Sequence, residues 1–243
     1  MTFIVTKAPA QAPSETEVSS LEARFRRRDA TIGIIGLGYV GLPLAQTAAK
    51  RGYKVLGFDV DPKKVSMLNA GQSYIRHIPS DGLKALREQR LFAATVDFSR
   101  LVEADAILIC VPTPLTKYRE PDMSFVENTT RELAKYLRRG QLIVLESTTY
   151  PGTCSEVMRP ILEAHGMRCG VDFFLAYSPE REDPGSPDFN TASIPKVVGG
   201  DGEVARRLAL ALYGELVVQT VPVSSLETAE AVKLTENIFR AVN

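Results

Sequence analysis

Residues 31–59 read TIGIIGLGYVGLPLAQTAAKRGYKVLGFD, and this stretch decides the fold. An apolar strand pattern leads into the Gly-rich turn Gly36-Leu37-Gly38-Tyr39-Val40-Gly41, which is followed by a helical pattern and a second strand pattern that ends at Asp59. A GxGxxG turn between a strand and a helix, with an acidic residue after the next strand, is typical of a dinucleotide-binding βαβ unit. The stretch therefore predicts the start of a Rossmann-type domain.

Each glycine of the turn has a separate physical reason. Gly36 permits the tight turn, Gly38 lets the backbone approach a pyrophosphate, and Gly41 lets the helix pack closely on the strand. The phosphates then lie at a helix N-terminus, where backbone N–H groups and the helix dipole favour anions. Asp59 is placed to accept hydrogen bonds from ribose hydroxyls, and its charge repels a 2′-phosphate. We therefore expect NAD as the cofactor, with Lys64 also within reach of a phosphate.

Short apolar segments alternate with helical patterns along the rest of the chain. We expect strands at residues 31–35, 54–58, 92–95, 104–111, 141–146, 173–177, 196–198 and 217–221. We expect helices at residues 42–51, 62–70, 81–88, 124–137, 154–165, 202–213 and 225–242. Continuous apolar segments such as Ile107-Leu108-Ile109 are typical of strands buried on both faces. The alternation predicts an α/β fold of the Rossmann type: a doubly wound, mostly parallel sheet with helices on both faces, ending in a truncated long helix.

Three segments are expected along the chain. Residues 1–30 form a flexible or short-helical N-terminal tail, and its four arginines form a solvated face: Arg24, Arg26, Arg27 and Arg28. Residues 31–224 form the NAD-binding domain. Residues 225–243 begin a long central helix that reaches the end of the chain with neither a Gly cap nor a Pro. We therefore expect the C-terminal remainder of the natural protein to be absent from this chain.

Composition excludes several classes of protein. The 243 residues carry no formal net charge, and 44% of them are hydrophobic and 24% charged, as in ordinary globular proteins. Without a basic excess, nucleic-acid and membrane-surface partners are disfavoured. No apolar segment approaches the roughly 18 residues of a membrane span, and the first residues show no apolar h-region, so we expect no secretory signal. Cys110, Cys154 and Cys169 show no CxxC spacing, so we expect no metal site, a cytoplasmic location and a buried Cys110.

Polar residues and prolines follow three of the expected strands. These loops begin with Cys110-Val111-Pro112-Thr113-Pro114, Ser147-Thr148-Thr149 and Ser178-Pro179-Glu180-Arg181-Glu182. Because ligands of open α/β sheets bind outside the carboxyl ends of the strands, these loops are candidates for a binding site. Simple strand-ending turns and helix caps are the alternative interpretation.

The expected last helix carries Lys233, Asn237 and Arg240 at spacings of four and three residues. This spacing puts all three side chains on one helical face. Such a face suits a phosphorylated or carboxylated ligand. From spacing alone, a solvated helix face is the favoured interpretation.

Seven motifs together carry a family resemblance. They occur in the order GLGYVGLPLA, VLGFDVD, CVPTPL, ESTTYPGT, YSPERE, IPKVVGG and KLTENIFRAVN. Over residues 31–243 the chain resembles the UDP-glucose/GDP-mannose dehydrogenase family, and residues 69–71, 117–124 and 179–185 resemble its branch acting on UDP-N-acetylhexosamines. The resemblance implies two NAD-dependent oxidation steps that convert the C6 alcohol of UDP-N-acetylglucosamine to the uronic acid, for surface polysaccharide synthesis. UDP-glucose, UDP-N-acetylmannosamine and GDP-mannose are alternative substrates, and an NAD-binding module without catalysis is the alternative class.

The resemblance also implies roles for individual residues. The catalytic set comprises a lysine and an asparagine that bind the reacting oxygens, an acid/base glutamate and a threonine near the nicotinamide: Lys233, Asn237, Glu180 and Thr148. Cofactor contacts fall on Gly36, Gly38, Tyr39, Val40, Gly41, Asp59, Lys64, Thr113 and Thr148. Binding of the nucleotide-sugar substrate falls on Arg181, Glu182, Lys233, Asn237 and Arg240.

The chain departs from the family pattern at its C-terminal end. The family's thiol nucleophile lies in a Gly-rich, Cys-containing motif C-terminal to the long helix, and its UDP-binding domain also lies there. Neither Cys154 nor Cys169 stands in such a motif. Because the covalent step needs a thiolate, we expect this chain to be inactive alone. The resemblance further implies that the full-length protein is a homodimer or larger, joined through the long helix.

Overall fold

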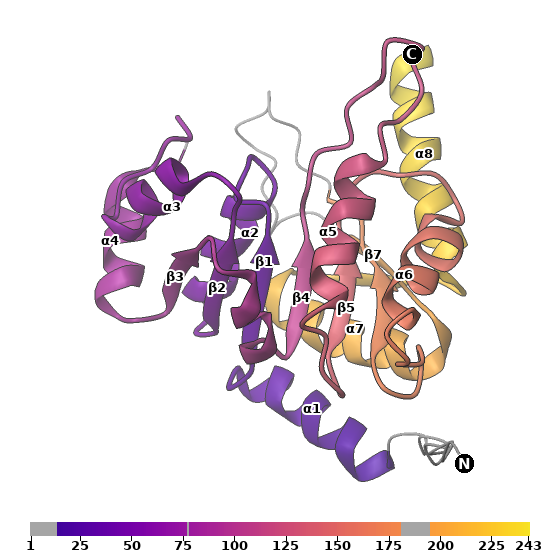
Figure 1. The fold of residues 1–243 in the computed structure, drawn as a ribbon, viewed down its shortest axis with the longest axis horizontal. Coiled ribbons are helices and arrows are strands. Elements are labelled where there is room, and N and C mark those ends of the chain that lie inside the picture. The colour runs from indigo at the N-terminus through magenta and orange to yellow at the C-terminus, as the bar shows by residue number, and fades with distance from the viewer. Residues whose placement is uncertain (1–13, 77, 181–194) are drawn as a thin grey trace, which may run out of the picture.

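The computed structural model describes residues 14–76, 78–180 and 195–243. The strands are β1 (Thr31–Ile35), β2 (Lys54–Phe58), β3 (Phe92–Thr95), β4 (Ala106–Ile109), β5 (Leu142–Leu145), β6 (Phe174–Tyr177), β7 (Lys196–Gly200) and β8 (Thr220–Pro222). The helices are α1 (Glu15–Arg27), α2 (Gly41–Lys50), α3 (Pro62–Asn69), α4 (Ser80–Glu88), α5 (Ser124–Ala134), α6 (Arg159–Glu163), α7 (Gly202–Leu216) and α8 (Leu226–Val242), together with η1 (Phe98–Glu103) and η2 (Thr153–Met158). Figure 1 shows the helices on both faces of the sheet.

The sheet has eight strands in the order β3-β2-β1-β4-β5-β6-β7-β8. All neighbours are parallel except β6 and β7, which are antiparallel. The expected doubly wound, mostly parallel sheet is therefore confirmed. The chain builds outward from β1 to β3 and then returns to place β4 on the other side of β1. Ligands of such sheets bind at this reversal, outside the carboxyl ends of the strands.

The two faces of the sheet bury separate cores, and β4 shows why its sequence is apolar throughout. Ala106 and Leu108 pack in a core with residues of α2 and α7, whereas Ile107 and Ile109 pack in a second core with residues of α5 and α8. Successive side chains of a strand point to opposite faces. A strand covered by helices on both faces therefore has no position for a polar side chain.

The expected helix over residues 154–165 is present in two parts. The segment η2 is a π-helix, and regular α-helix starts only at Arg159. Pro160 has no backbone N–H, so the α-helical hydrogen bond to the carbonyl four residues earlier is lost there. The 3-10 helix η1 lies outside the expected helices; Asp97 begins it by accepting a hydrogen bond from the backbone N–H of Ser99.

The N-terminal helix α1 is a regular helix of 13 residues. It starts with a capping box, in which Ser14 and Glu17 satisfy each other's backbone N–H groups. Its buried face carries Val18, Leu21 and Phe25, and it packs against α7. In Figure 1, α1 lies below the amino-terminal edge of the sheet, and α8 rises beyond the opposite edge.

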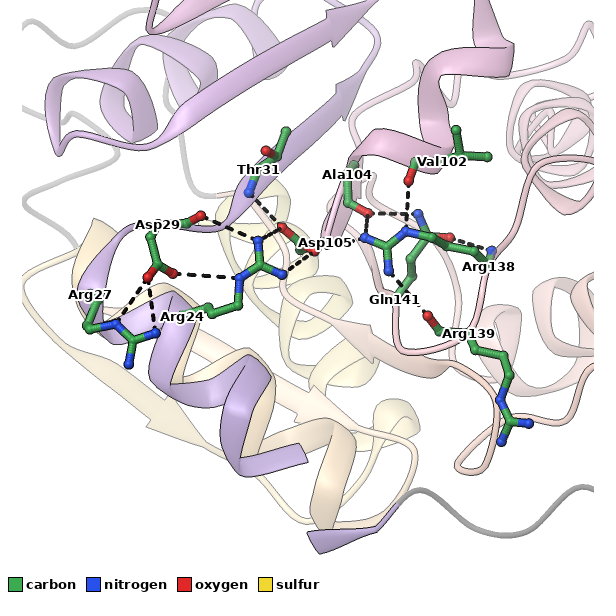
Figure 2. A network of polar contacts seen from close by, with 10 residues as sticks. All are labelled: Arg24, Arg27, Asp29, Thr31, Val102, Ala104, Asp105, Arg138, Arg139 and Gln141. Atoms are coloured by element: carbon green, nitrogen blue, oxygen red, sulfur yellow. Dashed lines mark hydrogen bonds and ion pairs between the residues drawn. The ribbon is translucent and has the colours of Figure 1, made fainter. Parts of the chain in front are cut away.

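Arg24 corrects the expectation that the arginines of this segment form a solvated face. Figure 2 shows its guanidinium on the carboxylate of Asp105, with nitrogen–oxygen distances of 2.8 and 2.6 Å. Arg138 and the backbone N–H of Thr31 also donate to this carboxylate, each at 2.8 Å. We call Arg24, Asp105 and Arg138 the Asp105 cluster. A buried carboxylate needs such partners, and α1 supplies one of them.

Candidate functional site

The Gly-rich turn is built so that two of its glycines have no substitute. Gly36 has a φ of 89°, and a Cβ there would lie 2.7 Å from the carbonyl oxygen of Cys110. A Cβ on Gly41 would lie 1.8 Å from the carbonyl oxygen of Gly36. A Cβ on Gly38 would instead meet no atom within 4 Å. The space beside Gly38 fits a group that approaches the backbone closely, such as a pyrophosphate.

The acid at the end of β2 lies against the same turn. The carboxylate of Asp59 is buried and accepts hydrogen bonds from the backbone N–H groups of Leu37 and Asp61, both at 3.0 Å. Each carboxylate oxygen has a further lone pair with which to accept a ribose hydroxyl. The ammonium of Lys64 lies 3.8 Å from Asp59 Oδ2. Within the described residues no side chain caps the α2 N-terminus beside them. These features fit a dinucleotide.

Tyr74 contacts this turn from another part of the chain, and sequence reasoning gave it no role there. Its hydroxyl donates to the carbonyl of Leu37, and Lys64 Nζ lies 5.7 Å from the centroid of its ring. Burial, with help from the charges of Asp59 and Asp61, raises the pKa of Tyr74, so the hydroxyl stays a donor. Nothing in the motif spacing points to Tyr74, because it reaches the turn from the loop between α3 and α4.

A cavity of about 210 Å³ opens at the carboxyl ends of β4, β5 and β6. It brings together five residues expected at the site from five separate segments: Val40, Thr113, Thr148, Glu180 and Lys233. The other residues lining it are Cys110, Val111, Pro112, Glu146 and Ser147. Tyr39 lies at the neighbouring turn with 62% of its surface exposed. We call this cavity the strand-end pocket.

The loops that follow β4 and β5 are tied to one another. Thr113 Oγ1 donates to the carbonyl of Thr148 at 2.8 Å, and Ser147 Oγ donates to the carbonyl of Val111 at 2.6 Å. These two bonds hold the pocket wall together across two adjacent strand ends. Thr148 thus has a defined place at the site through its backbone carbonyl.

Helix α8 is anchored one turn before its lysine. The buried carboxylate of Glu230 accepts hydrogen bonds from the backbone N–H groups of Gly152 and Cys154, at 2.6 and 2.9 Å. Lys233 follows on the inner face, is 7% exposed, and donates from Nζ to the carbonyl of Glu180 at 2.5 Å. Asn237 is half-buried one turn further along and is not among the described residues lining the pocket.

A buried cluster adjoins the pocket, and sequence reasoning identified only Glu180 among its members. Lys196 Nζ lies 2.7 Å from Glu146 Oε2 and 3.2 Å from Glu180 Oε2, and the hydroxyl of Tyr213 donates to Glu146 Oε1. We call these four residues the Lys196 cluster. A charged residue beside an apolar strand was the available signal: Glu146 follows β5, and Lys196 begins β7.

Burial sets the protonation of the Lys196 cluster. Loss of solvation raises the pKa of Glu146 to about 7, against the attraction of Lys196 and with the repulsion of Glu180. Burial opposes the charge of Lys196, but Glu146 and Glu180 together raise the pKa of its ammonium above the ordinary value. The pKa of Tyr213 is raised by burial, so its hydroxyl remains a donor. Lys196 is therefore a cation held between two acids.

Some expected substrate contacts fall where the structure gives no description. Arg181 and Glu182 lie outside the described residues, and the side chain of Arg240 is likewise outside them. Their roles stay predictions from the resemblance.

The three cysteines are buried or partly buried. Cys110 is 7% exposed and packs in the core, as expected. Burial raises the pKa of the Cys154 thiol and of the Cys169 thiol, which makes both poor sources of thiolate. Among the described residues no group of His, Cys, Asp or Glu side chains is arranged to hold a metal ion. In the same residues no helix combines the length and apolarity that a bilayer crossing requires.

The fold and the turn define a dinucleotide-binding domain of the Rossmann type. The chain belongs to the UDP-glucose/GDP-mannose dehydrogenase family: residues 30–217 match the model of that family's NAD binding domain. The expected family is confirmed, and NAD is the cofactor of this domain.

Similar proteins include two enzymes and one solved structure. The chain is 37% identical over 213 residues to a UDP-N-acetyl-D-mannosamine dehydrogenase of Pyrococcus horikoshii, covering 87% of this chain and 51% of the relative. It is 34% identical to a UDP-N-acetyl-D-glucosamine 6-dehydrogenase of Pseudomonas aeruginosa, covering 89% and 51%. The structure of an NDP-N-acetyl-D-galactosaminuronic acid dehydrogenase from Methanosarcina mazei matches with a TM-score of 0.81 and 35% identity, covering 90% of this chain and 50% of that one. The chain thus spans about half the length of these relatives.

Proposed function

We propose that this chain is the NAD-binding part of a nucleotide-sugar 6-dehydrogenase that oxidises the C6 alcohol of UDP-N-acetylglucosamine to the uronic acid in two NAD-dependent steps. The strand-end pocket carries the proposal. Its lining joins Val40 of the Gly-rich turn to Glu180 and Lys233, so one cavity has a cofactor turn on one side and a buried acid and amine on the other. A hydride transfer needs that adjacency.

The residues proposed to hold the cofactor surround the turn and the pocket: Gly36, Gly38, Tyr39, Val40, Gly41, Asp59, Lys64, Thr113 and Thr148. NAD, when bound, supplies the hydride acceptor for each oxidation step. Lys233 and Asn237 bind the oxygen on C6, and the ammonium of Lys233 stabilises negative charge that develops on it. Glu180 accepts the proton that the alcohol loses, as a buried carboxylate beside an amine can do. Thr148 positions the water that the second step adds.

Substrate specificity is the finer part of the proposal. The segments at residues 69–71, 117–124 and 179–185 support a UDP-N-acetylhexosamine. UDP-N-acetylmannosamine is the second candidate, because the mannosamine dehydrogenase shares 37% identity with this chain, against 34% for the glucosamine enzyme. We propose that Arg181, Glu182 and Arg240 contact the nucleotide sugar, and that the product enters surface polysaccharide synthesis in the cytoplasm.

Cofactor preference tests the turn. We expect calorimetric titration of residues 1–243 to give tighter binding of NAD than of NADP, because Asp59 repels a 2′-phosphate. Asp59→Asn keeps the shape of the side chain and removes its charge. We expect it to weaken NAD binding about tenfold and to reduce the preference for NAD over NADP. Lys63→Met is the matched control, since it removes an exposed charge near the acid and keeps the acid. Tighter binding of NADP by the unsubstituted chain would contradict the assignment.

Turnover tests the reaction. We expect the full-length protein to form NADH with UDP-N-acetylglucosamine and to lose at least about 10³-fold in kcat on Lys233→Met. Residues 1–243 alone should bind NAD without forming NADH, because the nucleophilic thiol is supplied elsewhere. A panel of UDP-N-acetylmannosamine, UDP-glucose and GDP-mannose ranks the alternatives by kcat/KM. Best turnover of UDP-glucose would overturn the branch assignment.

We also propose that the full-length protein is a homodimer or larger through α8. This helix exposes apolar side chains along one side, namely Leu234, Ile238, Phe239 and Val242. Exposed apolar surface of this kind commonly marks an interface. Light scattering of the full-length protein gives the mass, and a monomer at micromolar concentration would contradict the proposal.

A further inference from the structure

Lys196 is a buried cation whose hydrogen-bonding capacity is fully used. It is 3% exposed, and its Nζ lies 2.7 Å from Glu146 Oε2, 3.2 Å from the carbonyl of Pro179 and 3.2 Å from Glu180 Oε2. An ammonium has three N–H donors, and here it meets three acceptors. Lys196 therefore has no donor left for a substrate, and its role must pass through the residues that it holds.

Two of these acceptors belong to consecutive residues at the exit of β6. Lys196 Nζ donates to both the backbone carbonyl of Pro179 and the carboxylate of Glu180. The next carbonyl oxygen, that of Glu180, accepts a hydrogen bond from Lys233 Nζ at 2.5 Å. The contacts thus run without a gap from Lys196 on β7, through one short segment, to Lys233 on α8.

Lys196 is itself held from behind. Glu146, from the end of β5, is oriented by the hydroxyl of Tyr213 on α7, and Lys196 Nζ lies 5.2 Å from the centroid of the Tyr213 ring. Partners from β5 and α7 thus set the ammonium on β7 in place. A charge so deep in a protein persists only when every donor is matched, as it is here.

We propose that Lys196 is the positioning residue of the strand-end pocket: it holds the segment of Pro179 and Glu180 so that the Glu180 carboxylate and the Lys233 ammonium keep one geometry. The catalytic meaning of that geometry rests on the proposed function, but the geometry itself does not. Loss of Lys196 releases the segment of Pro179 and Glu180, and Lys233 then loses its fixed position on the Glu180 carbonyl. Lys196→Arg retains a permanent positive charge and several N–H donors for these acceptors.

Chemical labelling of residues 1–243 tests the geometry without turnover. Acetylation of each lysine by an activated ester is followed by mass spectrometry, with the exposed Lys50 as internal reference. Lys196→Met should raise the acetylation rate of Lys233 at least about tenfold, because the Lys233 amine then leaves its buried position. In Lys196→Arg this rate should stay within about threefold of the unsubstituted chain. Glu146→Gln keeps an acceptor oxygen for Lys196, so it should also stay close to the unsubstituted chain. NAD affinity, which reports on the Gly-rich turn at the other side of the pocket, verifies folding; if Lys196→Met fails this check, Lys196→Gln replaces it.

An unchanged Lys233 rate in a Lys196 variant that still binds NAD overturns the proposal, as does an equal rise in Glu146→Gln, which would assign the effect to charge. In the full-length protein, Lys196→Met should lower kcat about 10²-fold while KM for the nucleotide sugar changes less than about threefold, with activity recovered in Lys196→Arg. A purely structural role would not lower kcat while leaving KM nearly unchanged. If the unsubstituted protein forms no NADH from any nucleotide sugar, the proposed function fails, and the labelling result still decides the role of Lys196.

Discussion

The Asp105 cluster and the Lys196 cluster both pair a buried charged group with groups of opposite charge, and they lie at opposite edges of the same sheet. Asp105 comes just before β4, at the amino-terminal edge, whereas Glu146 comes just after β5, at the carboxyl edge. The first has one carboxylate between two guanidinium groups. The second has one ammonium between two carboxylates.

The difference lies in how completely each charge is compensated. Both oxygens of Asp105 accept two N–H donors each, from Arg24, Arg138 and Thr31, which saturates the carboxylate. In the Lys196 cluster the acids outnumber the base, and burial raises the pKa of Glu146 to about 7. The saturated carboxylate of Asp105 stabilises the fold and has no acceptor position left for a ligand. In the Lys196 cluster the carboxyl of Glu146 gains and loses its proton near neutral pH, as is common for groups at functional sites.

Removing the carboxylate breaks the saturated cluster most severely. Asp105→Ala leaves two partly exposed guanidinium groups and a backbone N–H without their acceptor, and we expect a loss of about 3 kcal/mol in the free energy of unfolding. Urea denaturation of residues 1–243 measures it. NAD affinity of the folded variant should be unchanged, because the turn lies at the other edge. Glu103→Ala removes an exposed ion pair with Arg100 and is the control, at about 0–1 kcal/mol. Equal losses in both variants would refute the contrast.

Because of Glu146, the contribution of the Lys196 cluster to the free energy of unfolding should depend on pH. The pKa of this carboxyl in the folded chain, about 7, exceeds its ordinary value of 4.5. Protonation therefore favours folding: the contribution is fully present below pH 4.5 and is lost as the pH rises through 7. Between pH 5 and 8, the free energy of unfolding should fall by about 2–3 kcal/mol more than in Glu146→Gln, which has no proton to lose. Parallel pH profiles of the two proteins would show that Glu146 titrates normally.

The sequence predicted the parts of the molecule that depend on local patterns. The strands followed from apolar segments, and the turn followed from glycine spacing, because both are properties of neighbouring residues. The sites of Lys233 and Glu180 needed the family resemblance, since spacing alone favoured a solvated face for Lys233. The capping box at Ser14 and Glu17 was a readable signal for α1 that composition alone does not convey.

The two clusters were beyond such patterns because their partners are far apart along the chain. Arg24 and Asp105 are separated by 81 positions, and Lys196 and Glu146 by 50. Each residue alone has an ordinary explanation, as a surface arginine or as a charge at a strand end. Only the strand order, which brings β5, β6 and β7 side by side, makes Lys196 and Glu146 neighbours.

A smaller change tests whether the Asp105 cluster is as redundant as its geometry indicates. Arg24→Ala leaves Arg138 and the N–H of Thr31 on the carboxylate, so we expect a loss of only about 1–2 kcal/mol in the free energy of unfolding, well below that of Asp105→Ala. Arg26→Ala on the same helix removes an exposed pair with Glu22 and should cost less than about 0.5 kcal/mol.

Denaturation of the two arginine variants under the same conditions then separates docking of α1 from its surface charge. A loss in Arg24→Ala no larger than in Arg26→Ala would mean that α1 is held by its apolar face alone. A loss as large as in Asp105→Ala would mean that the carboxylate depends on Arg24 for its compensation. The expected intermediate value follows from saturation: four donors share the charge, so the loss of one arginine leaves Asp105 partly satisfied, whereas the Lys196 cluster has a single cation to lose.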